Sequence, residues 1–254
     1  MTIDAVGPFD AALTNRILLV ADDGPVPRML AAGLERSGCT VARASTKDDD
    51  LFGKAVDHDT IVYLPARSFL GVSSGREGFL SANPREVLAA ANAPGVQLLV
   101  TVLPASSGVT IVEEAIQRSG IPYFIVRTPS LVEELKAELD ELDGESASTV
   151  WAPACDGIPL GDADALVRTV CECIVDERQG RTIELPATIR DVPTAVRRAL
   201  GGGERRVIPV WPPIFQMGRV AARMMRGRDT ADVRLIDALL AGAERCSAPP
   251  RRAA

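Results

Sequence analysis

The sequence predicts an α/β protein with a doubly wound parallel sheet of the Rossmann type and a small C-terminal lobe. Short apolar runs of strand length alternate with helical stretches between residues 16 and 127, as in proteins with a parallel sheet. The 254 residues are 46% hydrophobic and 24% charged, an ordinary globular composition that can supply a core of this size.

The first β–α–β unit opens with an apolar strand at 16–20. A turn-rich stretch at 21–27 leads into a helix at 26–37, where apolar residues recur at helical spacing. Gly38 follows, at the position where glycine commonly ends a helix, and a second strand is predicted at 40–44. A unit of this length has the size of a parallel crossover connection.

The alternation continues through three further strands and two helices. The strand at 96–103 is apolar on both faces, as expected of a central parallel strand. Pro84 lies in the first turn of its helix, where proline is tolerated. The strands are predicted at 60–64, 96–103 and 122–127, and the helices at 83–92 and 109–119.

After residue 130 the simple alternation ends. We predict an acidic helix at 131–143, with a solvated face formed by Glu133, Glu134, Glu138 and Glu141. We predict further helices at 162–176, 191–200, 214–226 and 230–241, a strand at 181–185, and an extended segment at 207–210. The expected divisions are an N-terminal extension (1–14), a Rossmann-like domain (15–150), a region that completes the sheet and forms the lobe (151–246), and a flexible tail (247–254).

The composition argues against several classes of function. Lys+Arg 28 and Asp+Glu 34 give a formal net charge of -6, whereas nucleic-acid binding needs a basic face. Five irregularly spaced cysteines are not a disulfide framework, and one histidine excludes His-based zinc patterns. No apolar run has the length of a membrane span, and residues 1–13 lack the basic residues of a secretory signal. We expect a cytoplasmic protein with free thiols and no metal.

Several segments, taken in order, carry a family resemblance. They are 17–30 (ILLVADDGPVPRML), 57–66 (DHDTIVYLPA), 83–103 (NPREVLAAANAPGVQLLVTVL), 119–129 (SGIPYFIVRTP) and 157–185. Together they resemble the short-chain dehydrogenase/reductase superfamily, and within it the extended and atypical branch of epimerase-like and NmrA-like proteins. The resemblance implies a cofactor, NADP or NAD, in the crevice at the carboxyl ends of the strands.

The resemblance also places candidate cofactor-binding residues. Arg43 ends the second strand, where the family reads the adenosine ribose, and an arginine there suits the 2′-phosphate of NADP. The alternative for Arg43 is a solvated arginine at a strand end. The full set is Asp23, Gly24, Pro25 and Val26 in the first turn, Arg43, then Leu64, Pro65 and Ala66 after the third strand, and Asn83 at the next helix.

The first turn departs from the family pattern of three glycines. The matching positions here are Ala21, Gly24 and Pro27, so only the glycine that lets the backbone approach the pyrophosphate remains. Asp22 and Asp23 add negative charge beside a helix N-terminus that normally attracts phosphate. We expect Asp23 to cap the helix that follows.

The proton relay of the family is absent. Its enzymes combine a Ser or Thr hydroxyl with a Tyr and a Lys four residues apart on one helix, and the Lys lowers the pKa of the Tyr. The only tyrosines here, Tyr63 and Tyr123, fall in predicted strands and are followed four residues later by Arg67 and Arg127. The helix at 109–119 carries neither a Tyr nor a Lys.

Three catalytic candidates remain. Ser106 and Ser107 follow the fourth strand, where the family hydroxyl stands, although paired serines are also typical of turns. Arg127, with Pro129, matches the family loop near the nicotinamide, and its alternative is a structural ion pair.

The arginines of the helix at 214–226 are candidates for binding an acidic partner, a phosphate ligand or a membrane. Alternatively, they line an ordinary surface helix.

The sequence is therefore compatible with three functions. The first is an atypical superfamily member that binds NAD(P) weakly or not at all and acts as a regulatory or complex-forming subunit, with a protein partner or as a homo-oligomer. The second is an NAD(P)-dependent oxidoreductase or epimerase-like enzyme with a non-standard active site at Ser106, Ser107 and Arg127. The third is a binder of another small molecule in the same crevice.

Overall fold

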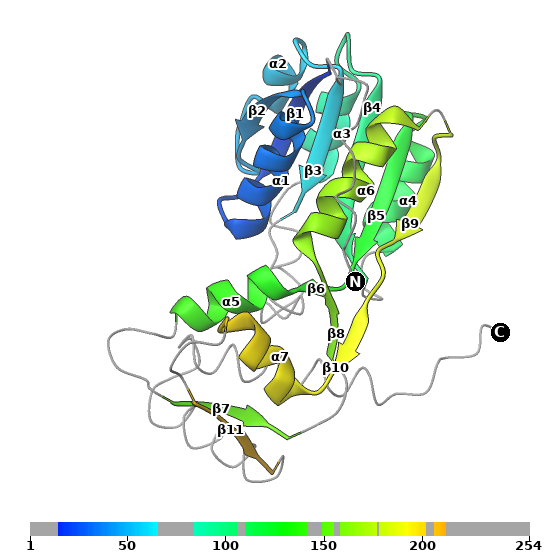
Figure 1. Cartoon of the computed structure of the whole chain (residues 1–254). Helices are drawn as coiled ribbons and strands as arrows, with labels where there is room; N and C mark the ends of the chain where they lie inside the picture. Colours follow the sequence, from blue (N-terminus) through cyan, green and yellow to red (C-terminus); the bar gives the residue numbers. More distant parts are fainter. Residues whose placement is uncertain are drawn as a thin grey trace, which may run out of the picture.

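The computed structural model describes residues 15–65, 84–105, 110–141, 149–154, 158–176, 178–201 and 206–211. They form a parallel sheet with helices on both faces and a smaller lobe below it (Figure 1). Strands β3 (Thr60–Leu64) and β5 (Tyr123–Thr128) point toward this lobe. The predicted fold class, a doubly wound α/β sheet with a small lobe, is confirmed.

The main sheet has six strands, all parallel, in the order β2-β1-β3-β4-β5-β9. The order reverses at β1, which pairs with β2 on one side and β3 on the other. The crevice outside the carboxyl ends of strands at such a reversal is the usual ligand site of open α/β sheets. The remaining bounds are β1 (Arg16–Ala21), β2 (Thr40–Ala44), β4 (Leu98–Pro104) and β9 (Arg181–Glu184).

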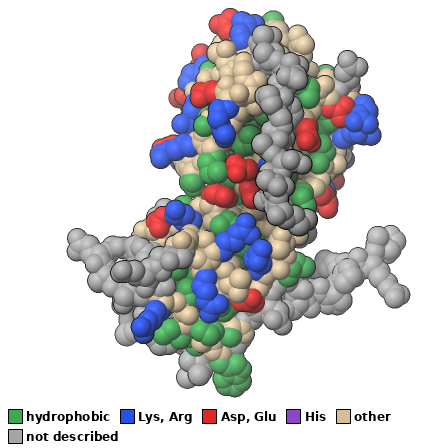
Figure 2. Space-filling model, in the orientation of Figure 1, with side chains coloured by type: hydrophobic (Ala, Val, Ile, Leu, Met, Phe, Trp, Pro, Cys, Tyr) green, Lys and Arg blue, Asp and Glu red, His purple; other side chains and the backbone are tan. Residues whose placement is uncertain are grey.

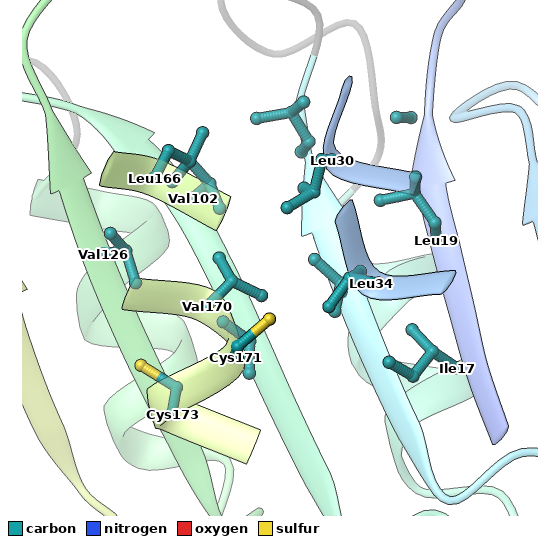
Figure 3. Packing of buried hydrophobic residues seen from close by; sticks show 14 of the residues in the cluster. Ile17, Leu19, Leu30, Leu34, Val102, Val126, Leu166, Val170, Cys171 and Cys173 are labelled. Carbon is teal, nitrogen blue, oxygen red and sulfur yellow. The ribbon is translucent and has the colours of Figure 1, made fainter. Parts of the chain in front are cut away.

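Helices cover both faces of this sheet, so alternate side chains of each strand enter different cores. Ile17 and Leu19 of β1 face the core under α1 and α6 (Figure 3), whereas Leu18 and Val20 face the core on the other side. All four are at most 1% exposed, which explains why the central strands read as continuous apolar runs. The helices are α1 (Pro25–Arg36) and α6 (Ala163–Val175) on one face, and α2 (Leu51–Ala55), α3 (Pro84–Ala91) and α4 (Thr110–Arg118) on the other.

The contact between α1 and α6 depends on a glycine. A Cβ atom added at Gly33 would lie 2.3 Å from Cγ1 of Val167, a distance that no side chain tolerates.

The cysteines of this region are thiols in the core. The hydroxyl of Ser37 lies 3.4 Å from Sγ of Cys171. Burial raises the pKa of Cys39 to about 11 and that of Cys173 to about 12, so these thiols stay protonated. The described cysteines, Cys39, Cys171 and Cys173, are buried and free, and Cys155 and Cys246 lie outside the described residues.

The lobe has its own core between α5 (Val132–Glu141) and α7 (Val192–Ala199), built from aliphatic residues such as Leu135 and Val196. Asp191 caps α7 by accepting a hydrogen bond of 2.9 Å from the Thr194 amide. Its strands are β6 (Ser130–Leu131), β8 (Ile158–Gly161) and β10 (Thr188–Arg190) in one sheet, and β7 (Thr149–Pro153) with β11 (Arg206–Val210) in another.

The acidic helix is not the solvated face expected from its sequence. Glu134 is 7% exposed, and its Oε2 accepts a hydrogen bond of 3.0 Å from the Leu131 amide. Glu133 is partly buried, and the loss of hydration, together with Asp162 and Asp164, raises the pKa of its carboxyl. The prediction is wrong here because α5 packs against α1 as well as α7. The side chains of Glu138 and Glu141 are outside the described set.

Four short strands were missed from sequence: β6, β7, β8 and β10. Residues 1–14, the helices predicted at 214–226 and 230–241, and the tail at 247–254 lie outside the described residues. In the described parts of the chain, no helix combines the length and apolar character needed to cross a membrane.

Candidate functional site

The turn between β1 and α1 lies at the carboxyl end of the sheet, beside the reversal of strand order. Gly24 is the N-cap residue of α1, in an extended conformation with φ 170, and no side chain caps this helix. The expectation that Asp23 caps the helix is wrong, because its carboxylate turns instead toward two arginines.

Asp23 joins α1 to the end of β2. Its Oδ2 accepts a hydrogen bond of 2.7 Å from Nη2 of Arg28, and its Oδ1 accepts one of 3.2 Å from Nε of the same residue. Nη2 of Arg43 lies 3.4 Å from that Oδ1. The hydrogen bond and charge of Arg28, followed by those of Arg43, lower the pKa of the Asp23 carboxyl. In this structure the half-exposed Arg43 therefore pairs with Asp23.

The neighbouring carboxylate has different partners. Oδ1 of Asp22 accepts hydrogen bonds from the hydroxyl of Thr46 at 2.5 Å, from the Thr46 amide at 3.3 Å and from the hydroxyl of Ser45 at 3.2 Å. These bonds tie the end of β1 to the residues that follow β2. Asp22 therefore acts as a structural acceptor at this corner.

The first turn of α1 offers few donors to a phosphate. Pro25 and Pro27 have no amide hydrogen, and the amide of Arg28 donates to the Gly24 carbonyl at 3.3 Å. An ordinary helix leaves the amides of its N-cap residue and of the next three residues without helical partners. Here these are residues 24–27, and the two prolines leave only the amides of Gly24 and Val26. The N-terminus of this helix is a poor pyrophosphate cradle.

Leu64 and Pro65 are buried at the end of β3, the strand next to β1. Tyr63 is 4% exposed, and burial, followed by the charge of Asp22, raises its pKa far above the ordinary value. Thr101 on β4 pairs in register with Tyr63, and its buried Oγ1 has no hydrogen-bond partner. Sequence reasoning missed Thr101, although it is the one hydroxyl in the apolar run 98–104.

Arg127 is committed to neighbouring carboxylates on another part of the sheet. Its Nε and Nη2 donate to the two oxygens of Glu113 on α4 at 2.7 and 2.6 Å, and its Nη1 lies 3.3 Å from Glu184 on β9. These bonds raise the pKa of the Arg127 guanidinium. The arrangement is an ion pair at the end of a strand.

The structure thus brings only some of the sequence-predicted site residues together. Asp23, Gly24, Pro25, Val26 and Arg43 surround one turn, while Leu64 and Pro65 end the adjacent strand. Arg127 belongs to β5, beyond β3 and β4 in the sheet. Four candidates, Ala66, Asn83, Ser106 and Ser107, lie outside the described residues.

On the face drawn in Figure 2, acidic side chains gather where the sheet meets the lobe, and basic side chains lie over the lobe. Within the described ranges, no three His, Cys, Asp or Glu side chains are grouped in a way that could hold a metal ion.

Comparison with known proteins gives a fold but no sequence family. No protein-family model matches this sequence, and no curated protein matches it significantly. A nucleoside-diphosphate-sugar epimerase from Staphylococcus aureus is similar in structure, with a TM-score of 0.61, 17% identity, and coverage of 91% of this chain and 90% of that one.

Two reductases solved with cofactor are also similar. The NADPH-dependent quinone oxidoreductase of Escherichia coli, complexed with NADPH, has a TM-score of 0.60 at 16% identity and covers 90% of this chain and 89% of its own. The dTDP-4-dehydrorhamnose reductase of Bacillus anthracis, in complex with NADP, has a TM-score of 0.64 at 14% identity, with coverage of 80% and 87%. The resemblance to short-chain dehydrogenase/reductase proteins is therefore confirmed at the level of the fold: this chain has the Rossmann-like fold of these epimerases and reductases.

Proposed function

We propose that this chain is an atypical protein of the short-chain dehydrogenase/reductase type that binds a nicotinamide dinucleotide weakly or not at all. In this proposal it acts as a regulatory or complex-forming subunit, with a protein partner or with a second copy of itself. The observation that carries the proposal is the turn before α1, where two prolines remove amide donors and Asp23 already occupies the two nearest arginines.

The tyrosines support the same proposal. Tyr63 is buried in β3, and its raised pKa opposes the ionisation that a proton relay requires. Tyr123 begins β5, and the residue four positions later, Arg127, is bound to Glu113 and Glu184. Neither tyrosine stands on a helix with a lysine one turn away, so hydride transfer by the usual Tyr–Lys route has no acid.

An NAD(P)-dependent oxidoreductase or epimerase-like enzyme with a non-standard site is the second candidate. One observation favours it: the charges of Asp22, Asp23, Arg28 and Arg43 sum to zero, so the turn has no net repulsion for a pyrophosphate. Similar folds also hold NADPH or NADP in two solved structures. Ser106, Ser107 and Arg127 are the residues to substitute if such an activity is found. A different small molecule in the same crevice is the third candidate.

Calorimetric titration of the purified chain with NADPH, NADP, NADH and NAD at near-physiological salt tests the proposal. We expect no saturable heat up to millimolar cofactor. Light scattering of the same protein determines its mass and so whether it is monomeric or self-assembled. A micromolar dissociation constant for any of the four cofactors would contradict the proposal and favour the enzyme. Turnover of about 1 s⁻¹ or more with a bound cofactor would establish that enzyme.

A further inference from the structure

The lobe has an exposed apolar tip, formed by the end of β11 and the residue that follows this strand. Ile208 is 38% exposed and Trp211 is 67% exposed, and Pro209 is exposed as well. Figure 2 shows hydrophobic side chains at the lower end of the lobe, where β11 ends in Figure 1. Large apolar side chains grouped on a surface in this way mark an interaction site.

Arginines flank this tip. Arg206 begins β11, two residues before Ile208 and therefore on the same face of the strand. Arg198 lies in the last turn of α7, the helix that packs against β11. Both arginines are exposed. Neither forms a salt bridge with a carboxylate in the part of the chain that the structure describes, unlike Arg16 and Arg118 of the main sheet domain.

The sequence that follows Trp211 continues the same chemistry. Residues 214–226 (IFQMGRVAARMMR), which are predicted to form a helix, combine large apolar residues with three arginines and contain no acidic residue. Only Pro212 and Pro213 separate this segment from Trp211, so it begins within about 11 Å of the tip. An apolar helix face bordered by arginines is typical of helices that lie in the surface of a membrane.

The charges of the tip decide between its possible occupants. If the tips of two copies met across a two-fold axis, the same arginines would face each other, and this like-charge contact opposes association. A bilayer with anionic headgroups suits both parts of the tip. Its phosphates pair with guanidinium groups, and the boundary between headgroups and acyl chains accepts an indole ring and aliphatic side chains.

We propose that the tip of the lobe, formed by Arg198, Arg206, Ile208 and Trp211, binds the surface of an anionic phospholipid bilayer, and that residues 214–226 lie beside it in the same surface. The whole chain has a net charge of -6, so its acidic remainder is repelled by the same lipids. The repulsion orients the protein with this end toward the membrane. The inference goes beyond the proposed function and does not involve the crevice.

The experiment measures co-sedimentation of the full chain with two kinds of vesicle, one of phosphatidylcholine alone and one of equal parts phosphatidylglycerol and phosphatidylcholine. The variants are Trp211→Ala and Arg206→Gln. Ile189→Ala is the matched apolar control, because Ile189 is 71% exposed on β10 of the same lobe. Arg168→Gln is the matched charge control, because Arg168 is exposed on α6. Circular dichroism checks that each variant is folded.

We expect the wild type to sediment with the anionic vesicles only, and its binding should weaken as the salt concentration rises. Arg206→Gln should weaken binding about fivefold, the contribution of one basic residue near an anionic surface. Trp211→Ala should weaken it about tenfold, because less apolar surface is buried. Both controls should bind like the wild type. Tryptophan emission should shift to shorter wavelength on binding, and this shift should be absent in Trp211→Ala.

Three results would overturn the inference: no binding to either kind of vesicle, equal binding to both kinds, or full binding by folded Trp211→Ala and Arg206→Gln proteins. A wild type that ignores vesicles but is dimeric by light scattering, and that Trp211→Ala makes monomeric, would assign the tip to a second copy instead. Cofactor titration is independent of these results. Micromolar binding of NADPH would contradict the proposed function and leave the outcome with vesicles unchanged.

Discussion

The carboxylate of Glu113 on α4 receives two hydrogen bonds, of 2.7 and 2.6 Å, from the guanidinium of Arg127 on β5. The Glu113 side chain is 6% exposed and that of Arg127 is 38% exposed. A buried carboxylate is tolerated only where a partner satisfies it. The pair therefore fixes α4 on its face of the sheet.

We predict that Arg127→Ala lowers the free energy of unfolding by about 2 kcal/mol, because it leaves the buried carboxylate of Glu113 without its partner. The partial exposure of Arg127 places this loss below that of a fully buried pair. Urea unfolding measures the change. Glu184→Gln is the control, and it should change stability by at most about 0.5 kcal/mol, since Glu184 is largely exposed. A fully stable Arg127→Ala protein would contradict the structural role of the pair.

Gly33→Ala should destabilise the protein by about 2 kcal/mol, because the new methyl group would overlap Val167 on α6. The double variant Gly33→Ala/Val167→Ala should recover part of that loss. Gly24→Ala is the comparison: its Cβ would meet no atom closer than 3.6 Å, at Cδ of Pro27, and its extended backbone suits any residue. Thermal unfolding of the three variants measures the effects. A larger loss for Gly24→Ala than for Gly33→Ala would mean that the helix contact is misplaced.

In an alkaline titration, Tyr63 should ionise at a higher pH in the native protein than in the unfolded protein. Burial raises the pKa of Tyr63 in the folded protein above its unfolded value of about 10. The contribution of protonated Tyr63 to the free energy of unfolding is therefore fully present below about pH 10 and is lost as the pH rises above this value. Phenolate absorbance should show Tyr63 still protonated at about pH 11 in the native protein and ionised in urea. Tyr63→Phe identifies its signal by subtraction. Ionisation of Tyr63 near pH 10 in the folded protein would reopen its candidacy as an acid.

Glu133→Gln should stabilise the protein at neutral pH, since burial and the nearby Asp162 and Asp164 disfavour the carboxylate. A raised folded pKa means that the wild type loses stability as the pH rises through the unfolded value of about 4.3. The advantage of the variant should therefore vanish below about pH 4. Chemical denaturation at several pH values measures it, with Glu172→Gln, exposed on α6, as the control. An advantage that persists in acid would point to packing.

The main sheet was predictable because burial on both faces leaves a strong apolar signal. Strands β2 and β3 have the predicted bounds, and β1, β4 and β5 differ from them by one or two residues. The short strands β6 and β10 carry no such signal, because two or three residues are too few to show an apolar run or an alternation. The burial of Glu134 was also hidden, since it depends on the Leu131 amide and on the packing of α5 rather than on helical periodicity.

The candidate site was predictable only in part. Parallel strands end at the same edge, so Arg43 could be placed beside the turn from the order of elements alone. The partner of Arg43 could not be predicted from the sequence, because Asp23 had a plausible local role as a helix cap. Only the backbone of the turn, with Gly24 as the N-cap residue, directs the Asp23 carboxylate toward Arg28 and Arg43.

The lobe is assembled from two stretches of chain that are separated by α6 and β9 of the main sheet. Its core combines Leu135 and Ile158 from the first stretch with Val192 and Val196 from the second. During synthesis, the core of the lobe cannot form until α7 has emerged from the ribosome. By then every strand of the main sheet has already emerged. For the same reason, no single uninterrupted gene fragment encodes the lobe alone, so recombination cannot transfer it as a cassette without carrying α6 and β9 with it.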